Sequence, residues 1–265
     1  MPTASATVQV MIDAARKAAR GLIRDFGEVA ELQVSKKGAA DYVSAADLKA
    51  EQTLFELLSK ARPGYGFLAE ERGMVEGSDK THTFIVDPLD GTTNFLHSIP
   101  QFAINIALER DGQVVASVTY NPVMNELFWA EKGKGAFLND RRLRVAARTK
   151  LVEAVLATGI PFAGRAGHAQ FLKELHQLTQ RVSGVRRFGS AALDLAWTAA
   201  GRFDGYWERN LSAWDIAAGG LMITEAGGRI TSADGADFDP REGTALASNL
   251  ELHPQILELL NAAKS

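Results

Sequence analysis

Two aspartates three residues apart, Asp87 and Asp90, form the segment of the sequence best suited to chemistry. The apolar run 84–86 leads into Asp87, and Pro88 favours extended backbone at the residue before it. We therefore expect a strand that ends at Asp87. We expect Asp90 to be the N-cap of a short helix that begins in the Gly-Thr-Thr-Asn run, residues 91–94. Both carboxylates would then lie beside a helix N-terminus, whose free N–H groups bind phosphate.

Carboxylates this close together repel each other unless something compensates their charge. Two unit charges ~4 Å apart interact by about 4 kcal/mol at an effective dielectric constant near 20. Proteins relieve such repulsion by protonating one group or by binding a cation. Beside a phosphate-binding helix end the pair favours a cation, and an all-oxygen ligand set favours Mg²⁺ over zinc. From the spacing alone, a turn in which Asp90 merely caps a helix is an equally good interpretation.

Two further segments place an acid at the end of a predicted element. Glu70 follows the apolar run 67–69, so it fits the end of a strand. Asp215 falls in the first turn of a helix predicted for residues 213–226, where the helix dipole favours negative charge. Taken alone, each has a simpler interpretation: a charged loop for Glu70 and a dipole-favoured acid for Asp215.

In this order and at this spacing, the segments resemble the inositol monophosphatase family, and most closely its bacterial SuhB-type branch. The paired-aspartate motif at 87–95 carries most of the resemblance, together with the Trp-Asp block at 214–219 and the acidic run at 67–71. Blocks at 37–47 and 186–208 extend the match over nearly the whole chain. The resemblance implies an α/β fold of layered αβαβα type, and a homodimer.

The resemblance implies that the acidic segments meet in one metal site with two or three Mg²⁺ ions. One Mg²⁺ would bind Glu70, Asp87 and the backbone carbonyl of Leu89. A second would bind Asp87, Asp90 and Asp215, so that Asp87 bridges the pair, as two-metal hydrolytic sites require. The family pattern also allows a third, weaker ion near Glu70.

The resemblance also implies roles around the metals. Glu70 would position a metal-activated water, and Thr92 with Asp47 would orient or deprotonate it. Glu208 would accept hydrogen bonds from sugar-alcohol hydroxyls. The implied substrate-binding residues are Asp90, Gly91, Thr92, Thr93, Gly189, Ser190, Ala191, Glu208 and Asp215. Lys36 and Lys37 match the family lysine equally well.

The reaction implied is hydrolysis of myo-inositol phosphate to myo-inositol and phosphate, dependent on Mg²⁺ and sensitive to lithium. Fructose-1,6-bisphosphatase, nucleotide phosphatase and histidinol phosphatase are alternatives on the same scaffold, since metal ligands do not distinguish among them. An alternative of another class is a binding role. The SuhB-type branch is associated with transcription antitermination and ribosomal RNA maturation, and the partners would then be transcription elongation factors.

The remaining sequence describes the elements that must position these acids. Residues 4–28 predict an amphipathic helix, residues 29–44 a hairpin, and the following chain to about residue 140 a second helix and a largely antiparallel sheet. After it, strands and helices alternate, which is typical of an α/β unit. We therefore predict an N-terminal lobe, 1–145, with most metal ligands, and a C-terminal lobe, 146–265, with Asp215 and the substrate-selecting residues.

The composition excludes several other classes of protein. The 265 residues carry a net charge of −3, without the basic excess typical of general nucleic-acid binding. The absence of cysteine excludes disulfides, thiolate metal sites and a cysteine nucleophile. We find no signal-peptide pattern and no apolar run of about 18 residues. We therefore expect a cytoplasmic protein that does not enter the membrane.

Overall fold

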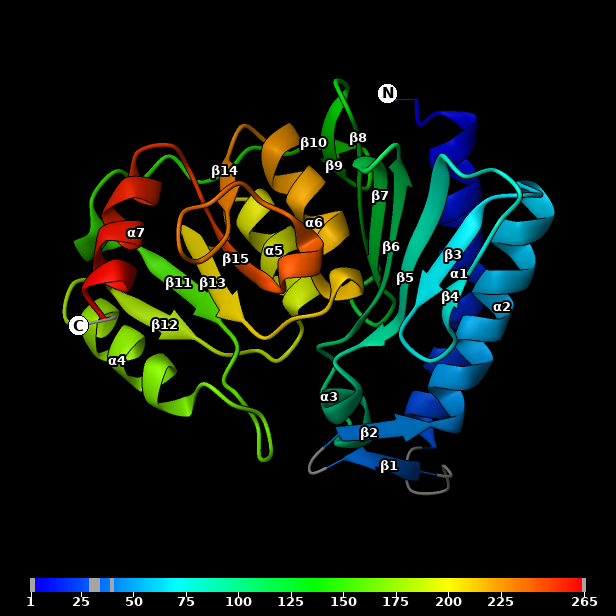
Figure 1. The fold of residues 1–265 in the computed structure, drawn as a ribbon, viewed down its shortest axis with the longest axis horizontal. Helices are drawn as coiled ribbons and strands as arrows, with labels where there is room; N and C mark the ends of the chain where they lie inside the picture. The colour runs from blue at the N-terminus through cyan, green and yellow to red at the C-terminus, as the bar shows by residue number, and fades with distance from the viewer. Residues whose placement is uncertain (1–2, 29–33, 39–40, 264–265) are drawn as a thin grey trace.

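The structure, a computed structural model, describes residues 3–28, 34–38 and 41–263, with the backbone alone at 34–38 and 41–44. Its elements stack in five layers in the order helix, sheet, helix, sheet, helix (Figure 1). This confirms the layered αβαβα architecture that the family resemblance implied. Among the described residues, none of the helices combines the length and apolar character needed to cross a bilayer.

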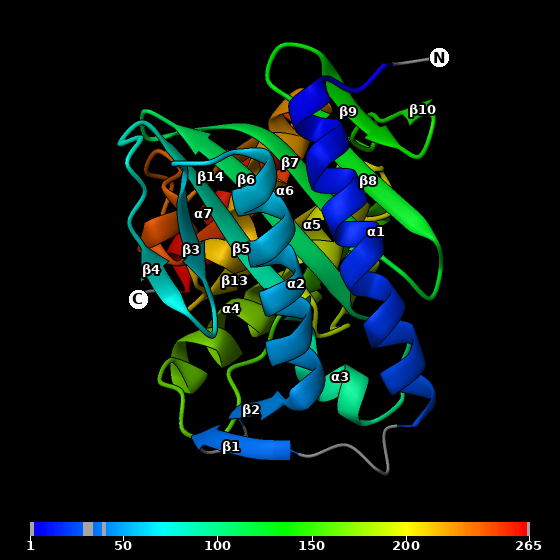
Figure 2. The same cartoon turned by 90° about the vertical axis from the view of Figure 1, so that its right-hand side faces the viewer.

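The first two layers are a helix pair and a large sheet. Helices α1 (Ala6–Gly27) and α2 (Ala45–Ala61) lie side by side on one face of the sheet (Figure 2). The sheet has the order β10-β9-β8-β7-β6-β5-β3-β4, and all its pairings are antiparallel except β3 with β5. Its strands are β3 (Gly66–Ala69), β4 (Gly73–Val75), β5 (His82–Asp90), β6 (Ala103–Arg110), β7 (Gln113–Asn121), β8 (Glu126–Glu131), β9 (Gly135–Leu138) and β10 (Arg141–Arg142).

The other three layers come from the C-terminal part of the chain. Helices α5 (Ala191–Ala199) and α6 (Ala213–Glu225) lie between the sheets, and α4 (His168–Thr179) and α7 (Leu252–Ala262) form the far outer layer (Figure 1). The small sheet has the order β12-β11-β13-β15-β14. Its strands are β11 (Val155–Thr158), β12 (Gly184–Arg186), β13 (Gly205–Arg209), β14 (Arg229–Thr231) and β15 (Thr244–Ser248). The division of the chain at residue 145 into two lobes remains a prediction.

Short elements complete the description. They are the antiparallel strands β1 (Val34–Gly38) and β2 (Asp41–Ser44), the helix α3 (Thr92–Leu96), and the 3₁₀ turns η2 (Leu151–Glu153) and η3 (Pro240–Glu242). The pairing of β1 with β2 confirms the predicted hairpin, although residues 29–33 and 39–40 lie outside the described part.

The position of α6 follows from its sequence. Ile216, Met222 and Ile223 are fully buried, and they belong to the same apolar cluster as residues of both sheets. A helix that is apolar on most sides must be covered on most sides. The N-terminus of α6, which carries Asp215, is therefore held between the sheets.

The segment with the paired aspartates differs from our prediction in two respects. Strand β5 continues to Asp90 instead of ending at Asp87, and its pairing with β6 shifts register between these two residues. Proline has no N–H to donate, and strands accommodate it at such irregularities, so Pro88 bends the strand without ending it. The N-cap of α3 is Gly91 rather than Asp90, at a φ of 96° that favours glycine. Asp90 is therefore free of the capping role.

Gly77 marks a close approach that holds the start of β3, the strand that leads to Glu70. A Cβ atom at Gly77 would lie 2.0 Å from the carbonyl oxygen of Gly64 and 2.5 Å from the carbonyl carbon of Tyr65. Because backbone would have to move, we expect Gly77→Ala to reduce the free energy of unfolding by roughly 2–3 kcal/mol, measured by thermal melting.

Gly21→Ala is the matched control for Gly77→Ala. Gly21 lies within α1, and apart from its chain neighbours and the backbone of its own helix a Cβ atom there would have no atom within 4 Å. We expect the alanine to leave the melting temperature unchanged or to raise it, by up to about 1 kcal/mol of stability. Equal melting temperatures for the two variants would contradict the packing argument.

Candidate active site

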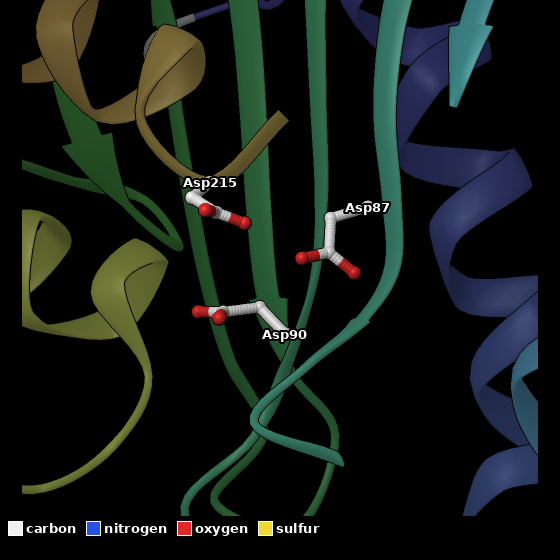
Figure 3. A group of neighbouring side chains, drawn as sticks. All are labelled: Asp87, Asp90 and Asp215. Atoms are coloured by element: carbon white, nitrogen blue, oxygen red, sulfur yellow. The ribbon is translucent and has the colours of Figure 1, made fainter. Parts of the chain in front are cut away.

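Three carboxylates from two distant parts of the chain meet at the end of β5 (Figure 3). Asp87 and Asp90 come from β5, Asp215 comes from the first turn of α6, and one oxygen of each lies within 4.8 Å of the others. Asp87 and Asp90 are only 2% and 9% exposed. Acids held at this density out of water require protons or cations to compensate their charge.

Burial and mutual repulsion govern the protonation of this cluster. Burial raises the pKa of Asp87 well above its ordinary value, and the charges of Glu70, Asp90 and Asp215 raise it further. Burial and Asp90 likewise raise the pKa of Asp215. Burial raises the pKa of Asp90 only to about 6, because hydrogen bonds from the Ser190 hydroxyl and from α5 backbone N–H groups stabilise its charged form. Without a cation the cluster therefore retains protons to higher pH than isolated aspartates do.

The N-terminus of α6 is fixed by hydrogen bonds to the large sheet. The carboxylate of Asp215 accepts a hydrogen bond from the backbone N–H of Ser212 at 2.7 Å. The side chain of Asn105, on β6, donates to the backbone carbonyls of Trp214 and Asp215 at 2.7 and 3.2 Å. This amide joins the third aspartate to the sheet that carries the other two. We did not predict Asn105, because its partners are more than a hundred residues away along the chain.

Glu70 follows β3 directly, as predicted, and lines the same pocket as the three aspartates. The carboxylate of Glu51, on α2, accepts hydrogen bonds from the backbone N–H groups of Glu71 and Arg72 at 2.8 and 3.3 Å. Glu51 is 3% exposed, so this buried acid fixes the turn that presents Glu70. Nothing in the local pattern of α2 singled out Glu51 in the sequence.

Thr92 and Asp47 are in contact. The hydroxyl of Thr92 lies 3.0 Å from Oδ1 of Asp47 and 3.1 Å from the carbonyl oxygen of Leu89, so its single proton faces two acceptors. Asp47 is fully buried in the first turn of α2. The structure thus joins the pair that the family resemblance implied, beside the carbonyl that we expected to bind a metal.

The pocket around these groups has a volume of about 170 Å³, suited to a small molecule. All the predicted site residues except Asp47 line this pocket, and Asp47 accepts a hydrogen bond from one of them, Thr92. The predicted lining residues are Glu70, Asp87, Leu89, Asp90, Gly91, Thr92, Thr93, Gly189, Ser190, Ala191, Glu208 and Asp215. The side chains of Lys36 and Lys37 lie outside the described part of the chain.

The start of α5 forms one edge of the pocket. Ser190 is the N-cap of this helix, and its side chain accepts the backbone N–H of Leu193 at 3.3 Å. Its hydroxyl also donates to Asp90, so the helix start and the acid cluster share a hydrogen bond. Gly189–Ala191 therefore begins a helix, as predicted.

Two arginines in the pocket were not among the predicted site residues. Arg165 belongs to the loop before α4, and its guanidinium lies 4.6 Å from the centre of the Phe162 ring. Arg187 lies two residues before Gly189. Arg187 falls within the block at 186–208 that extends the family resemblance, so the sequence held a signal for it, whereas the loop with Arg165 has no pattern that singles it out.

Comparisons with known proteins agree with this geometry. The model of the inositol monophosphatase family matches residues 4–265. The inositol-1-monophosphatase of Caulobacter vibrioides is 73% identical over 96% of this chain and 100% of its own length. The Nus factor SuhB of Pseudomonas aeruginosa is 40% identical over 94% of both chains.

The same relationship holds in three dimensions. The crystal structure of the extragenic suppressor protein SuhB from Bartonella henselae, 56% identical in sequence, has a TM-score of 0.94 and covers 97% of this chain and 98% of its own. The family model, the Caulobacter vibrioides relative and the Bartonella henselae structure each match this chain over nearly its whole length. The chain belongs to the inositol monophosphatase family, a family of metal-dependent phosphatases.

Proposed function

We propose that this protein hydrolyses phosphate monoesters, with myo-inositol 1-phosphate as substrate and Mg²⁺ as cofactor. The observation that carries the proposal is the convergence of Asp87, Asp90 and Asp215 in a pocket lined by oxygen donors. Three relatives that are 73%, 61% and 56% identical carry the name inositol-1-monophosphatase, which supports the choice of substrate.

The donor set fits Mg²⁺. Glu70, the three aspartates and the Leu89 carbonyl all offer oxygen, and the raised pKa values of Asp87 and Asp215 reflect a need for positive charge. In our proposal Glu70, Asp87 and the Leu89 carbonyl hold one ion, Asp87, Asp90 and Asp215 hold a second, and a third lies near Glu70. Bound there, Mg²⁺ would neutralise phosphate oxygens and make a nearby water more acidic.

The protein's own groups would align the reactants. Glu70 would orient the attacking water, and the Thr92 hydroxyl would receive a proton from that water while its own proton passes to the Asp47 carboxylate. The backbone N–H groups of Gly91, Thr92 and Thr93 would bind phosphate oxygens as charge develops on them. Gly189, Ser190, Ala191 and Glu208 would contact the polyol. No side chain forms a covalent intermediate in this scheme.

The substrate is tested by measuring phosphate release. We expect the highest kcat/KM for inositol 1-phosphate in a panel with fructose 1,6-bisphosphate, 3′-phosphoadenosine 5′-phosphate and histidinol phosphate. A much higher value for another member would overturn the substrate and leave the metal site standing. No release from any member in the presence of Mg²⁺ would overturn the proposal as a whole.

The contact between Thr92 and Asp47 predicts a selective effect on turnover. We expect Thr92→Val to lower kcat about 10²-fold with little change in KM, because the valine keeps the volume and removes the group that transfers a proton. Thr92→Ser keeps a hydroxyl and should retain most of the activity. Normal turnover in Thr92→Val, measured by steady-state phosphate release, would exclude the proton-transfer role.

The metal assignment also predicts inhibition by lithium. Li⁺ is a small, hard cation that carries half the charge of Mg²⁺, so it can occupy an oxygen site without supplying the same electrostatic stabilisation. We expect millimolar LiCl to reduce phosphate release, and an equal concentration of NaCl to leave it unchanged. Full activity at these lithium concentrations would count against close mechanistic kinship with the family.

A second candidate function rests on the similarity to the Nus factor SuhB of Pseudomonas aeruginosa. We propose that the protein also associates with transcription elongation factors, independently of catalysis. A pull-down with purified elongation factors tests this, using the wild type and Asp87→Asn. Retention by both would support the binding role, and retention by neither would refute it. A homodimer and a cytoplasmic location complete the proposal, and sedimentation equilibrium tests the dimer.

A further inference from the structure

Glu208 lines the pocket but is not one of the three acids that meet at the end of β5. It lies on β13, and its carboxylate is next to the Tyr206 hydroxyl and to Gly159. The hydroxyl of Tyr206, two residues earlier on the same face of the strand, donates to Oε2 at 2.7 Å. On the other side Gly159 makes room for the carboxylate, because a Cβ atom there would lie 1.8 Å from Oε1.

Tyr206 is suited to act as a fixed donor. Its side chain is fully buried, and burial together with the charges of Glu208 and Asp194 raises its pKa well above the ordinary value. The phenol therefore remains protonated. Asp194, 1% exposed, has an Oδ1 atom with no hydrogen-bond partner among the described residues. Asp194 is a second buried acid close to Glu208, whose charge raises the pKa of Asp194. The hydrogen bond from Tyr206 thus stabilises one of two neighbouring carboxylates.

Without that hydrogen bond, the Glu208 side chain could rotate toward other partners in the pocket. Arg165 and Arg187 line the same pocket, and their positive charges act on the Glu208 carboxylate by lowering its pKa, against the larger effect of burial. A glutamate side chain has three rotatable bonds, and a charge-assisted pair with an arginine is a strong competitor. The bond from Tyr206 opposes this rotation.

We infer that Tyr206 is a positioning residue, which holds the Glu208 carboxylate where it accepts hydrogen bonds from substrate hydroxyls and so makes the site selective for polyol phosphates. This inference rests on the proposed phosphatase function. It predicts that the Tyr206 hydroxyl matters for esters that carry hydroxyl groups near the phosphate, and not for esters that lack them.

The first experiment replaces Tyr206 by phenylalanine, which removes one oxygen and keeps the buried ring. We expect KM for myo-inositol 1-phosphate to rise about 10-fold, with kcat changed less than about 2-fold, since a hydrogen bond to a charged group is lost in binding. KM for p-nitrophenyl phosphate, which has no hydroxyl groups, should not change. Tyr120→Phe is the control, because it removes a hydroxyl bonded to Asn125 at 3.1 Å outside the pocket lining.

A double-mutant cycle tests whether Tyr206 acts through Glu208. Glu208→Ala should raise KM for the inositol ester, and adding Tyr206→Phe to it should raise KM no further, because the acceptor of the Tyr206 hydroxyl is then absent. Additive effects would overturn the inference. So would wild-type KM values in a folded Tyr206→Phe protein.

Gly159→Ala provides a test that does not depend on the folding of Tyr206→Phe. The alanine methyl would displace the Glu208 carboxylate without removing any polar group. We expect the same selective rise in KM for the inositol ester, and an unchanged KM for that ester would overturn the inference. A wild-type protein inactive on both esters would instead refute the proposed function, so the two failures are distinguishable.

Discussion

Replacement of Asp87 by asparagine is expected to lower kcat for phosphate release by about 10³-fold or more, because the bridging ligand of both proposed metals is lost. The volume and shape of the side chain are nearly unchanged, so the fold should remain. Asp13→Asn is the matched control: it makes the same chemical change on the exposed face of α1 and should leave activity at the wild-type level. Normal turnover in Asp87→Asn at saturating Mg²⁺ would refute the site.

The same variant is expected to melt at a higher temperature than the wild type in EDTA. The pKa of Asp87 is raised in the folded protein above its ordinary value of 3.8, so above that pH the folded state binds more protons than the unfolded state. The stability of the metal-free protein therefore falls as pH rises above about 4, and asparagine removes this contribution. Thermal melting at pH 5 and pH 8 measures the difference. A lower melting temperature for Asp87→Asn at pH 8 would contradict the electrostatic account.

Magnesium is expected to raise the melting temperature of the wild-type protein. A ligand at a hundred times its dissociation constant stabilises the folded state by about 2.7 kcal/mol per site. For a chain of this size that corresponds to about 5–10 °C. The increase should be larger at pH 8 than at pH 5, because protons compete with the cation for Asp90, whose pKa is about 6, and for Asp87.

Two controls separate site binding from ionic strength. KCl at matched ionic strength should not reproduce the increase, since a monovalent salt only screens the charges. Asp87→Asn should show a much smaller increase with Mg²⁺ than the wild type. Equal increases in the two proteins would place the bound magnesium elsewhere.

Local sequence patterns predicted the elements well but left the chemistry of the aspartate pair open. The spacing of Asp87 and Asp90 did not decide whether Asp90 caps a helix or binds a cation. The structure shows why: Gly91 takes the cap position, and Pro88 bends β5 without ending it. A proline can end a strand or lie at an irregularity within one. The sequence therefore left the end of β5 open, and only its pairing with β6 shows that the strand continues to Asp90.

The gathering of distant acids could be predicted only through the family resemblance. Whether Glu70 and Asp215 reach Asp87 depends on the parallel pairing of β3 with β5 and on the place of α6 between the sheets, and neither is written in a local pattern. Glu51 escaped prediction for the same reason, since it acts on residues 20 and 21 positions away. The contact of Tyr206 with Glu208 could have been predicted, because residues two apart on a strand point to the same face of the sheet.

The pocket is lined by residues from both sheets and from the helix layer between them. The large sheet supplies Asp87 and Asp90, the helix between the sheets supplies Asp215, and the small sheet supplies Glu208. During refolding, magnesium binding at the proposed site should therefore begin only after both sheets and the helix layer between them have packed together. Magnesium binding would thus report the last assembly step, and no binding is expected while either sheet forms on its own.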